Sequence, residues 1–212
     1  MVHQLRREAF APRQGAPVTI RKGEDWGEIV APPADLVDVA TDAALAEHLQ
    51  RLGSRPVRVR GGDLCATLGG PGDASTVRRV PIDVLRVETD AGSWRAVAHV
   101  VARRSWWRGP LLAVMNVDRR GAWDVAPRAH PGDGRADVVE VDAAMGVRAR
   151  WQARRRLPSG THVPHPQVHV RRTSDASWAF GQPRRLWVDG VERATVRSLR
   201  VVVEPDAAVV HC

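Results

Sequence analysis

The sequence predicts a mixed α/β protein, α+β in its overall organisation, in which a short α/β unit precedes a larger antiparallel β-rich part. Strand, helix, strand, turn and helix patterns follow one another between residues 36 and 70, which is the order of a parallel α/β unit. After residue 79, short β-rich segments alternate with Gly and Pro turns at intervals typical of antiparallel sheets. The apolar fraction of 43% in 212 residues is enough to form a hydrophobic core.

The front of the chain, residues 1–17, is expected to be a loose arm because it contains Pro and Gly but no periodic apolar pattern. A short strand is predicted at residues 18–20. The next strand is Leu36–Val39, and the helix after it runs from about Ala43 to Leu52 with leucines on one face. Gly53 ends this helix.

Three further elements complete the predicted α/β unit. A second strand covers Pro56–Val59, and Gly61-Gly62-Asp63 forms a flexible turn. A short helix, Leu64–Leu68, ends at Gly69-Gly70. A domain boundary is predicted near residue 78, where alternating strand and helix patterns give way to short β-rich segments.

The α/β unit therefore covers residues 18–78, and the β-rich part covers residues 79–212. A helix from about Met145 to Leu157 interrupts the β-rich part. The predicted strands of this part are Val80–Val87, Trp94–Val101, Leu111–Val117, Ala136–Val141, Val168–Arg172, Leu186–Val188 and Leu199–Val203.

Composition limits the class of protein. No apolar run approaches the roughly 20 residues of a membrane-spanning helix, and the first residues lack the apolar core of a secretory signal. Two cysteines exclude a disulfide framework and suit a reducing compartment, so we expect a cytoplasmic protein. The net charge of +8 comes almost entirely from arginine. It indicates either an anionic partner or, as the favoured interpretation, the codon bias of a GC-rich genome acting on a solvated surface.

Four segments carry a resemblance to known proteins. They are Gly61–Pro71 (GGDLCATLGGP), Val80–Val87 (VPIDVLRV), Trp123–Val138 (WDVAPRAHPGDGRADV) and Val188–Glu192 (VDGVE). In order and spacing they resemble the segments GTGNDLARTLGIP, R-x-I-D-L-G-R-V, I-A-P-x-A-x-x-x-DG-x-LDV and D-G-E of the diacylglycerol kinase and bacterial lipid kinase family, which is similar in fold to NAD kinase. The match spans about residues 36–210.

The resemblance implies a Rossmann-like α/β unit that binds ATP, followed by a diacylglycerol kinase-type antiparallel β-sandwich with lipid-facing and metal-linked residues. The family has several strands and helices before its first glycine turn, and only 35 residues precede Leu36 here. We therefore expect a truncated nucleotide domain. Phosphoryl transfer depends on positioning and charge neutralisation, so the residues at the phosphate turns decide whether the chain can catalyse it.

The resemblance places the nucleotide site at two turns. The first corresponds to the family's GGDGT turn and reads Ala40-Thr41-Asp42-Ala43 here, with Asp42 at the family's acidic position and all three glycines replaced. A Cβ at each replaced position blocks close approach of a phosphate to the backbone and penalises positive φ. The second turn carries Gly61, Gly62 and Asp63 where the family has GTGND, although a plain tight turn is an alternative interpretation of it.

The resemblance also assigns acidic residues. Asp133 matches the family position associated with a metal, and Asp137 matches the Asp of the LDV motif, so Mg²⁺ is implied there if the chain is a kinase. Asp189 matches the first residue of D-G-E, whereas Val191 stands at the catalytic Glu and Glu192 follows one residue later. On a strand, a shift of one residue moves a side chain to the opposite face. Asp189 and Glu192 are thus the candidate catalytic residues, and an ordinary turn is the alternative at Asp133.

Two basic segments contain tryptophan. Arg148–Arg156 is predicted to be a basic helix with Trp151, and Arg103–Arg108 contains a Trp pair. Either segment could contact anionic lipid headgroups or nucleic-acid phosphates, while a solvated helix face and a structural Trp pair are the favoured alternatives. The spacing of the histidines at 162, 165 and 169 does not favour a zinc site, because Cys partners and a closed set of four ligands are missing.

Three hypotheses about function follow. The leading one is a lipid-kinase-like protein that is catalytically impaired and acts as a binding or scaffolding module for a lipid or a small phosphorylated ligand, with peripheral contact to an anionic membrane. The second is an active lipid kinase that uses Mg²⁺ and ATP in an altered site containing Asp42, Asp63, Asp133 and Glu192. The third, a basic nucleic-acid-binding protein, is disfavoured because no recognised motif accompanies the charge.

Overall fold

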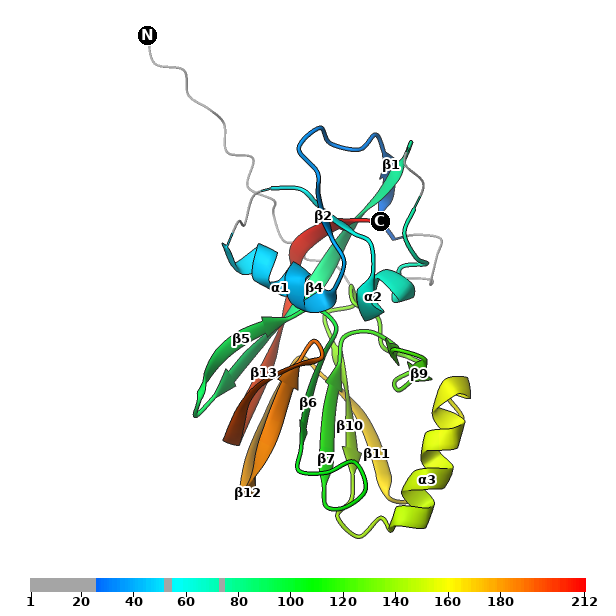
Figure 1. The fold of residues 1–212 in the computed structure, drawn as a ribbon, viewed down its shortest axis with the longest axis vertical. Helices are drawn as coiled ribbons and strands as arrows, with labels where there is room; N and C mark the ends of the chain where they lie inside the picture. The colour runs from blue at the N-terminus through cyan, green and yellow to red at the C-terminus, as the bar shows by residue number, and fades with distance from the viewer. Residues whose placement is uncertain (1–25, 52–54, 73–74) are drawn as a thin grey trace.

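The computed structural model describes residues 26–51, 55–72 and 75–212 (Figure 1). The predicted arm at residues 1–17 and the predicted strand at 18–20 lie outside these ranges. An 11-stranded sheet has the order β1-β4-β13-β12-β6-β7-β10-β11, with β3 also pairing with β13, β2 with β3, and β5 with β4. The β2–β3 and β3–β13 pairs are parallel, and the others in this sheet are antiparallel. A mixed α/β fold with a mostly antiparallel sheet is therefore confirmed.

The strands and helices alternate as the sequence predicts, although several are longer or shorter than expected. In chain order they are β1 (Glu28–Val30), β2 (Val37–Val39), α1 (Asp42–Arg51), β3 (Val57–Val59), α2 (Gly62–Thr67), β4 (Val77–Thr89), β5 (Gly92–Ala96), β6 (His99–Arg103), β7 (Leu111–Met115), β8 (Arg119–Arg120), β9 (Trp123–Asp124), β10 (Ala136–Val141), α3 (Val147–Arg156), the 3₁₀ turn η1 (Leu157–Ser159), β11 (Val168–Thr173), β12 (Asp175–Val188) and β13 (Val191–His211).

The α/β part contains β2, α1, β3 and α2 in the predicted order. Helix α1 begins where the Thr41 hydroxyl accepts a hydrogen bond from the amide of Ala44 at 3.1 Å, as an N-cap does. Leu45 is fully buried in a cluster with apolar residues of β2 and β3 and of the neighbouring parts of β4 and β13. Helix α2 starts two residues earlier than predicted, because Gly62 and Asp63 are already helical.

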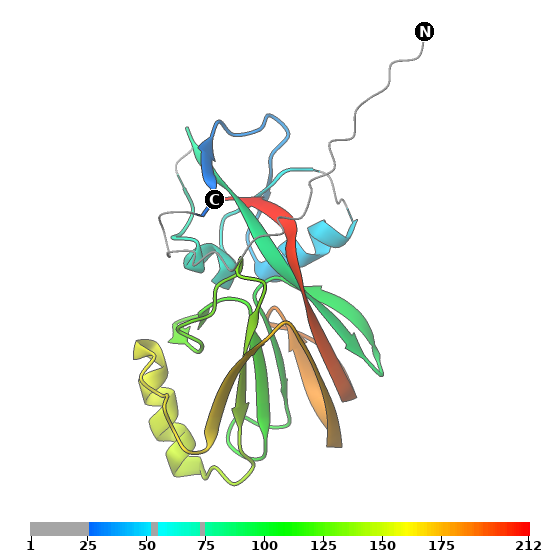
Figure 2. The same ribbon diagram turned by 180° about the vertical axis from the view of Figure 1, so that it is seen from behind.

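Strands β4 and β13 run through both parts of the molecule (Figures 1 and 2). The first residues of β4 pair with β1 and its last residues pair with β5, while β13 pairs with β12 over Val191–Val202 and with β3 at Val210 and His211. The two strands pair with each other from Leu199 to His211 of β13, with a bulge between Glu204 and Ala208. Position 78 lies inside β4, and the division of the chain there stays a prediction.

Strands β6, β7 and β10 carry apolar side chains on both faces. Val100, Leu112 and Val138 lie in the core that the curled sheet encloses. Val101 and Ala113 belong to a second cluster on the outer face. Successive side chains of a strand point to opposite faces, so a strand covered on both faces is an uninterrupted apolar run. This is why the predictions at residues 111–117 and 136–141 match the structure closely.

Helix α3 and its flanking turns cover the outer face of this sheet (Figures 1 and 2). It packs on the second cluster through Ala149 and Ala153, and Met145 precedes it in the same cluster. The helix stops at η1, whose following residue, Gly160, has a left-handed φ of 65°. Among the described residues, no helix is both long and apolar enough to cross a bilayer.

The predicted strand at residues 94–101 is wrong in one respect, because it is two strands. Strand β5 ends at Ala96 and β6 begins at His99. The amides of Val97 and Ala98 are bound by the side chain of Asp189 instead of a neighbouring strand. A side chain that is remote in sequence therefore makes the corner, which apolar periodicity alone does not indicate.

Candidate functional site

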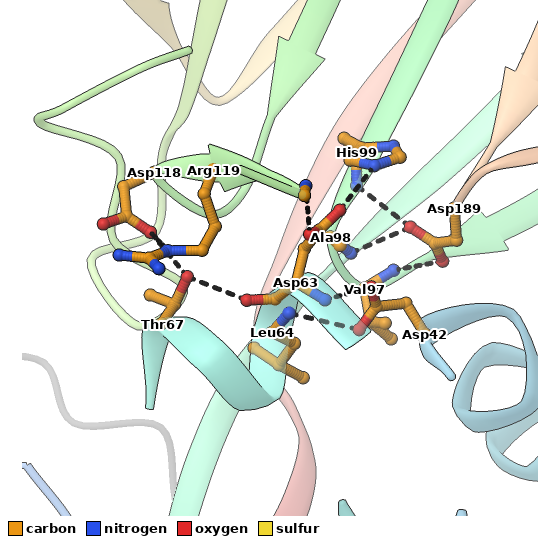
Figure 3. Close-up of polar contacts among 11 residues, drawn as sticks. Asp42, Asp63, Leu64, Thr67, Val97, Ala98, His99, Asp118, Arg119 and Asp189 are labelled. Atoms are coloured by element: carbon orange, nitrogen blue, oxygen red, sulfur yellow. Dashed lines mark hydrogen bonds and ion pairs between the residues drawn. The ribbon is translucent and has the colours of Figure 1, made fainter. Parts of the chain in front are cut away.

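The turn between β3 and α2 is held by Asp42 from the start of α1 (Figure 3). Its carboxylate accepts hydrogen bonds from the amides of Asp63 at 2.7 Å and Leu64 at 3.1 Å. Gly61 precedes α2 and has no side chain to cap the helix. Asp42 therefore caps α2 from a different element, and burial raises the pKa of its carboxyl to about 6.

Gly62 is required by this arrangement. Its φ is +94°, and a Cβ added there would lie 2.7 Å from Cγ of Asp42. Only glycine combines this backbone conformation with so close a neighbour at no steric cost.

We expect Gly62→Ala to lower the free energy of unfolding by about 2–3 kcal/mol, because it adds both backbone strain and a collision with Asp42. Gly69→Ala is the matched control, since Gly69 has φ +105° but nothing within 4 Å of an added Cβ. The control is expected to lose about 1 kcal/mol. Urea unfolding followed by circular dichroism measures both, and equal losses would contradict the contact between Gly62 and Asp42.

Three amides at the two helix starts are already bonded to side chains of the protein. Thr41 binds the amide of Ala44, and Asp42 binds those of Asp63 and Leu64. A phosphate at these helix starts would find these donors taken and would also meet the Asp42 carboxylate. The structure brings together the four residues predicted to mark a nucleotide site, Asp42, Gly61, Gly62 and Asp63, and Asp42 binds the amide of Asp63.

Asp63 connects α2 to the β-rich part. Its carboxylate lies 3.0 Å from Nε2 of His99 and accepts the amide of Gly121 at 2.6 Å. Burial raises the pKa of Asp63, but the bonds from His99 and Gly121 outweigh it and hold this pKa below 3.8. Asp63 is therefore ionised at neutral pH.

Asp189 lies behind His99 at the turn between β12 and β13 (Figure 3). Its two oxygens accept the amides of Val97, Ala98 and His99, each at 2.9 Å. The residue is 8% exposed, and burial raises the pKa of its carboxyl. Asp189 therefore positions the backbone that carries His99, and His99 in turn contacts Asp63.

A second connection between α2 and the β-rich part passes through Thr67. Its hydroxyl lies 2.6 Å from the carboxylate of Asp118, which also accepts Nε of Arg119 at 3.3 Å. The chain segment that leads into β8 is thus fixed to α2 at two points, Asp63 to Gly121 and Thr67 to Asp118.

The other predicted acids lie elsewhere. Asp133 and Asp137 share the guanidinium of Arg172, with Asp137 at 3.6 Å from its Nε. Glu192 is exposed at the start of β13 and pairs with Arg185 at 3.7 Å. Over residues 26–51, 55–72 and 75–212, no group of three or more His, Cys, Asp and Glu side chains is placed to hold a metal ion. Catalytic and metal roles for these residues stay predictions.

Asp137 is expected to make stability depend on pH. Burial raises its pKa from 3.8 to about 6, against the opposing charge of Arg172. The folded state therefore binds this proton more tightly, so the stabilisation is complete below pH 3.8 and is lost as the pH rises through about 6. Relative to the native protein, Asp137→Asn should gain about 1–3 kcal/mol in free energy of unfolding between about pH 4 and about pH 7.5. Urea unfolding at both pH values tests this. The prediction would be contradicted if the difference in free energy of unfolding between the variant and the native protein were the same at both pH values.

An apolar pocket of about 220 Å³ lies between α3 and the outer face of the sheet. Its polar lining groups are Arg120, Arg150, Arg154 and His162, and burial lowers the pKa of His162, which favours its neutral form. The remaining lining residues are Val101, Trp106, Trp107, Leu111, Ala113, Met115, Trp123, Val125, Val139, Val141, Met145, Ala153, Leu157 and Val168.

One end of this pocket adjoins Asp63. Arg120 lines the pocket, and the negative charge of Asp63 acts on its guanidinium. The next residue, Gly121, donates its amide to Asp63. The sequence did not predict the pocket or the roles of His99 and Arg120. The signals available were the Trp pair at 106 and 107, for which a structural role was favoured, and the basic helix, for which a solvated face was favoured.

Arg150 builds the wall of the pocket. The residue is 6% exposed, and its guanidinium donates to the carbonyls of Met145 at 2.9 Å, Asp142 at 2.9 Å and Trp106 at 3.2 Å, as well as to that of Gly109. One side chain thus joins α3 to the loop that carries Trp106 and Trp107.

Comparisons with known proteins were made for the whole chain. A scan against protein-family models and a search of curated proteins found no match. A solved structure of a diacylglycerol kinase from Bacillus anthracis str. Sterne has a TM-score of 0.59 at 13% identity, over 83% of this chain and 75% of that one. Two more from this organism, each provisionally named a diacylglycerol kinase, give 0.63 at 12% and 0.61 at 11% identity, over 83% of this chain and 77% of theirs. The fold is that of these structures, which confirms the fold that the resemblance implied.

Proposed function

We propose that this chain binds a lipid on a lipid-kinase-like fold and does not transfer phosphate by itself. The observation that carries the proposal is the apolar pocket beneath α3. Its volume of about 220 Å³ exceeds the roughly 150 Å³ of a cavity that admits benzene and is below the roughly 300 Å³ at which pockets for drug-sized ligands begin. An alkyl chain fits these dimensions and this lining.

The phosphate turns support the second half of the proposal. Kinases of any fold must neutralise and position phosphate oxygens, commonly with backbone amides at a helix start. Here the amides of Ala44, Asp63 and Leu64 are bonded to side chains of the protein. The side chain that holds two of them is a buried carboxylate, Asp42, which repels phosphate when ionised.

A second candidate function, an active lipid kinase with an altered nucleotide site, has one observation in its favour. Asp63 is ionised at neutral pH and adjoins the Arg120 end of the pocket, where a hydroxyl group of a bound lipid could give up its proton. Of the four acids in that hypothesis, Asp42 and Asp63 lie together, whereas Asp133 and Glu192 pair with Arg172 and Arg185.

Mg-ATP is expected to leave the melting temperature of the protein unchanged, because the amides of Ala44, Asp63 and Leu64 at the two described helix starts are already bonded to side chains. A lipid kinase would instead gain a few degrees at saturating nucleotide. Differential scanning calorimetry with and without Mg-ATP measures this. A clear rise, together with transfer of labelled phosphate to a lipid, would replace the proposal with the second candidate.

Ala113→Phe is the variant that tests the pocket, because Ala113 lines it and a phenyl ring would fill the space. We expect calorimetric binding of a ten-carbon chain, offered as decanol and as decanoate, to be lost in this variant. Val191→Phe adds similar bulk at a site that is 40% exposed and outside the pocket, and it should bind as the native protein does. Failure of the native protein to bind either amphiphile would contradict lipid binding.

A further inference from the structure

Three arginines lie over a group of tryptophans, of which Trp106, Trp107 and Trp123 line the pocket. The guanidinium of Arg103 lies between the rings of Trp106 and Trp187, 4.0 Å and 3.9 Å from their centroids. Arg120 lies 5.2 Å from the ring of Trp106, and Arg154 lies 5.2 Å from Trp123 and 5.5 Å from Trp107. Trp106 and Trp123 are themselves in edge contact at 6.2 Å, so the three cations belong to one continuous cluster. We call Arg103, Arg120 and Arg154 the arginine cluster.

The arginine cluster lacks carboxylate partners within the described part of the chain. Among residues 26–51, 55–72 and 75–212, no ion pair of 4.0 Å or less involves any of its three members, whereas several arginines on the sheet surface are paired. Examples of such pairs are Arg58 with Asp38, Arg86 with Glu204, Arg171 with Glu140 and Arg200 with Asp175. Asp63, whose charge acts on Arg120, is bonded to His99 and Gly121, and Glu192, whose charge acts on Arg103, pairs with Arg185.

Two members of the arginine cluster, Arg103 and Arg120, carry their positive charge in partly buried surroundings. Nε of Arg103 and Nε of Arg120 are buried and have no hydrogen-bond acceptor among the described residues. Burial, followed by the charges of Arg185 and Arg120, lowers the pKa of Arg103 to about 10. Stacking on tryptophan compensates part of this loss, since a cation over an indole ring is attracted to it. Charges removed from water are normally paired in proteins, so these arginines favour an anionic ligand.

We propose that the ligand of the pocket is a single-chain amphiphile with an anionic headgroup, a carboxylate or a phosphate monoester, which the arginine cluster binds while the chain lies beneath α3. This inference rests on the proposed lipid binding and adds the class of ligand. A guanidinium matches both headgroups because it presents parallel N–H donors to two oxygens. One chain is inferred because a cavity of about 220 Å³ is small even for a drug-sized ligand.

The test compares four ligands with the same ten-carbon chain and different heads: decanoate, decyl phosphate, decanol and decyltrimethylammonium. Binding to the full chain is measured by calorimetry and by the fluorescence of the pocket tryptophans, below the micelle concentrations. We expect the two anions to bind about tenfold or more tightly than decanol, and the cation most weakly. Inorganic phosphate at the same concentration is expected not to compete.

Arg154→Gln is the variant of choice, because Arg154 is exposed and the protein should fold without it. It is expected to weaken decanoate binding about tenfold and decanol binding by a much smaller factor. Arg148→Gln, an exposed arginine of the same helix outside the pocket, is the control and should change neither.

The outcomes separate the two proposals. Equal binding of all four heads would overturn the anionic headgroup and leave lipid binding intact. Binding of none of them would overturn both. Competition by inorganic phosphate as strong as that by decyl phosphate would show a site for free phosphate and would also overturn the inference. If Arg154→Gln preferred anions as strongly as the native protein does, the arginine cluster would not be what recognises the headgroup.

Discussion

Replacing Asp189 by alanine is expected to lower the free energy of unfolding by about 3–6 kcal/mol, a large share of the stability of an ordinary domain. Three buried amides, those of Val97, Ala98 and His99, would lose their acceptor at once. Each orphaned donor costs about 1–3 kcal/mol. Removal of a buried carboxylate whose pKa is raised by burial offsets part of this loss. Urea unfolding followed by far-ultraviolet circular dichroism measures the difference.

Asp206→Ala is the matched control for Asp189→Ala. Asp206 has nearly the same backbone conformation, φ 49° against 48° for Asp189, but its side chain is exposed. Any backbone strain that alanine introduces at positive φ is therefore common to both variants, at about 1–2 kcal/mol. Similar losses in the two variants would show that the hydrogen bonds of Asp189 contribute little.

Arg150→Met is expected to destabilise the protein by about 3–5 kcal/mol and to abolish binding of a ten-carbon chain. Methionine keeps the apolar stem but removes the guanidinium that donates to the carbonyls of Met145, Trp106, Gly109 and Asp142, of which Asp142 still accepts the amide of Met145. The loop with Trp106 and Trp107 then loses its connection to α3, and the pocket loses a wall. Thermal unfolding and calorimetric titration with decanoate measure the two effects.

Arg148→Met distinguishes the effect of the Arg150 hydrogen bonds from the effect of the positive charge of α3. Arg148 is exposed on α3 and lies outside the pocket, so its replacement should change stability by less than about 0.5 kcal/mol. A loss as large as that of Arg150→Met would show that α3 depends on its charge and not on the contacts of Arg150.

The sequence predicted the fold where strands are buried on both faces and helices carry one apolar face. Ala136–Val141 was predicted with the observed bounds, and α1 within one residue at each end. Strands β12 and β13 were predicted too short, as Leu186–Val188 and Leu199–Val203, because much of each is half-exposed and alternates with charged residues. Gly181 and Pro183 also lie inside β12, at a register shift. Gly and Pro are typical of turns, so the sequence indicates a strand end there.

The polar site was predictable only in part. Asp42, Gly61, Gly62 and Asp63 were identified together because they lie in two neighbouring turns of one α/β unit. His99 was missed because it approaches Asp63 through the corner that Asp189 makes, 90 residues away along the chain. The pocket was missed for the same reason, since Trp106, Val139 and Ala153 belong to three separate elements.

The course of β13 has a consequence for how this chain folds. Its residues Val210 and His211 are the neighbours of β3, so the parallel pair near the front of the sequence is completed by its last strand. Such a topology has a high contact order, and folding of this kind is slow because long loops must close before the contacts form. During translation the α/β part cannot acquire its full hydrogen bonding until residue 211 has left the ribosome, so it completes its folding together with the β-rich part.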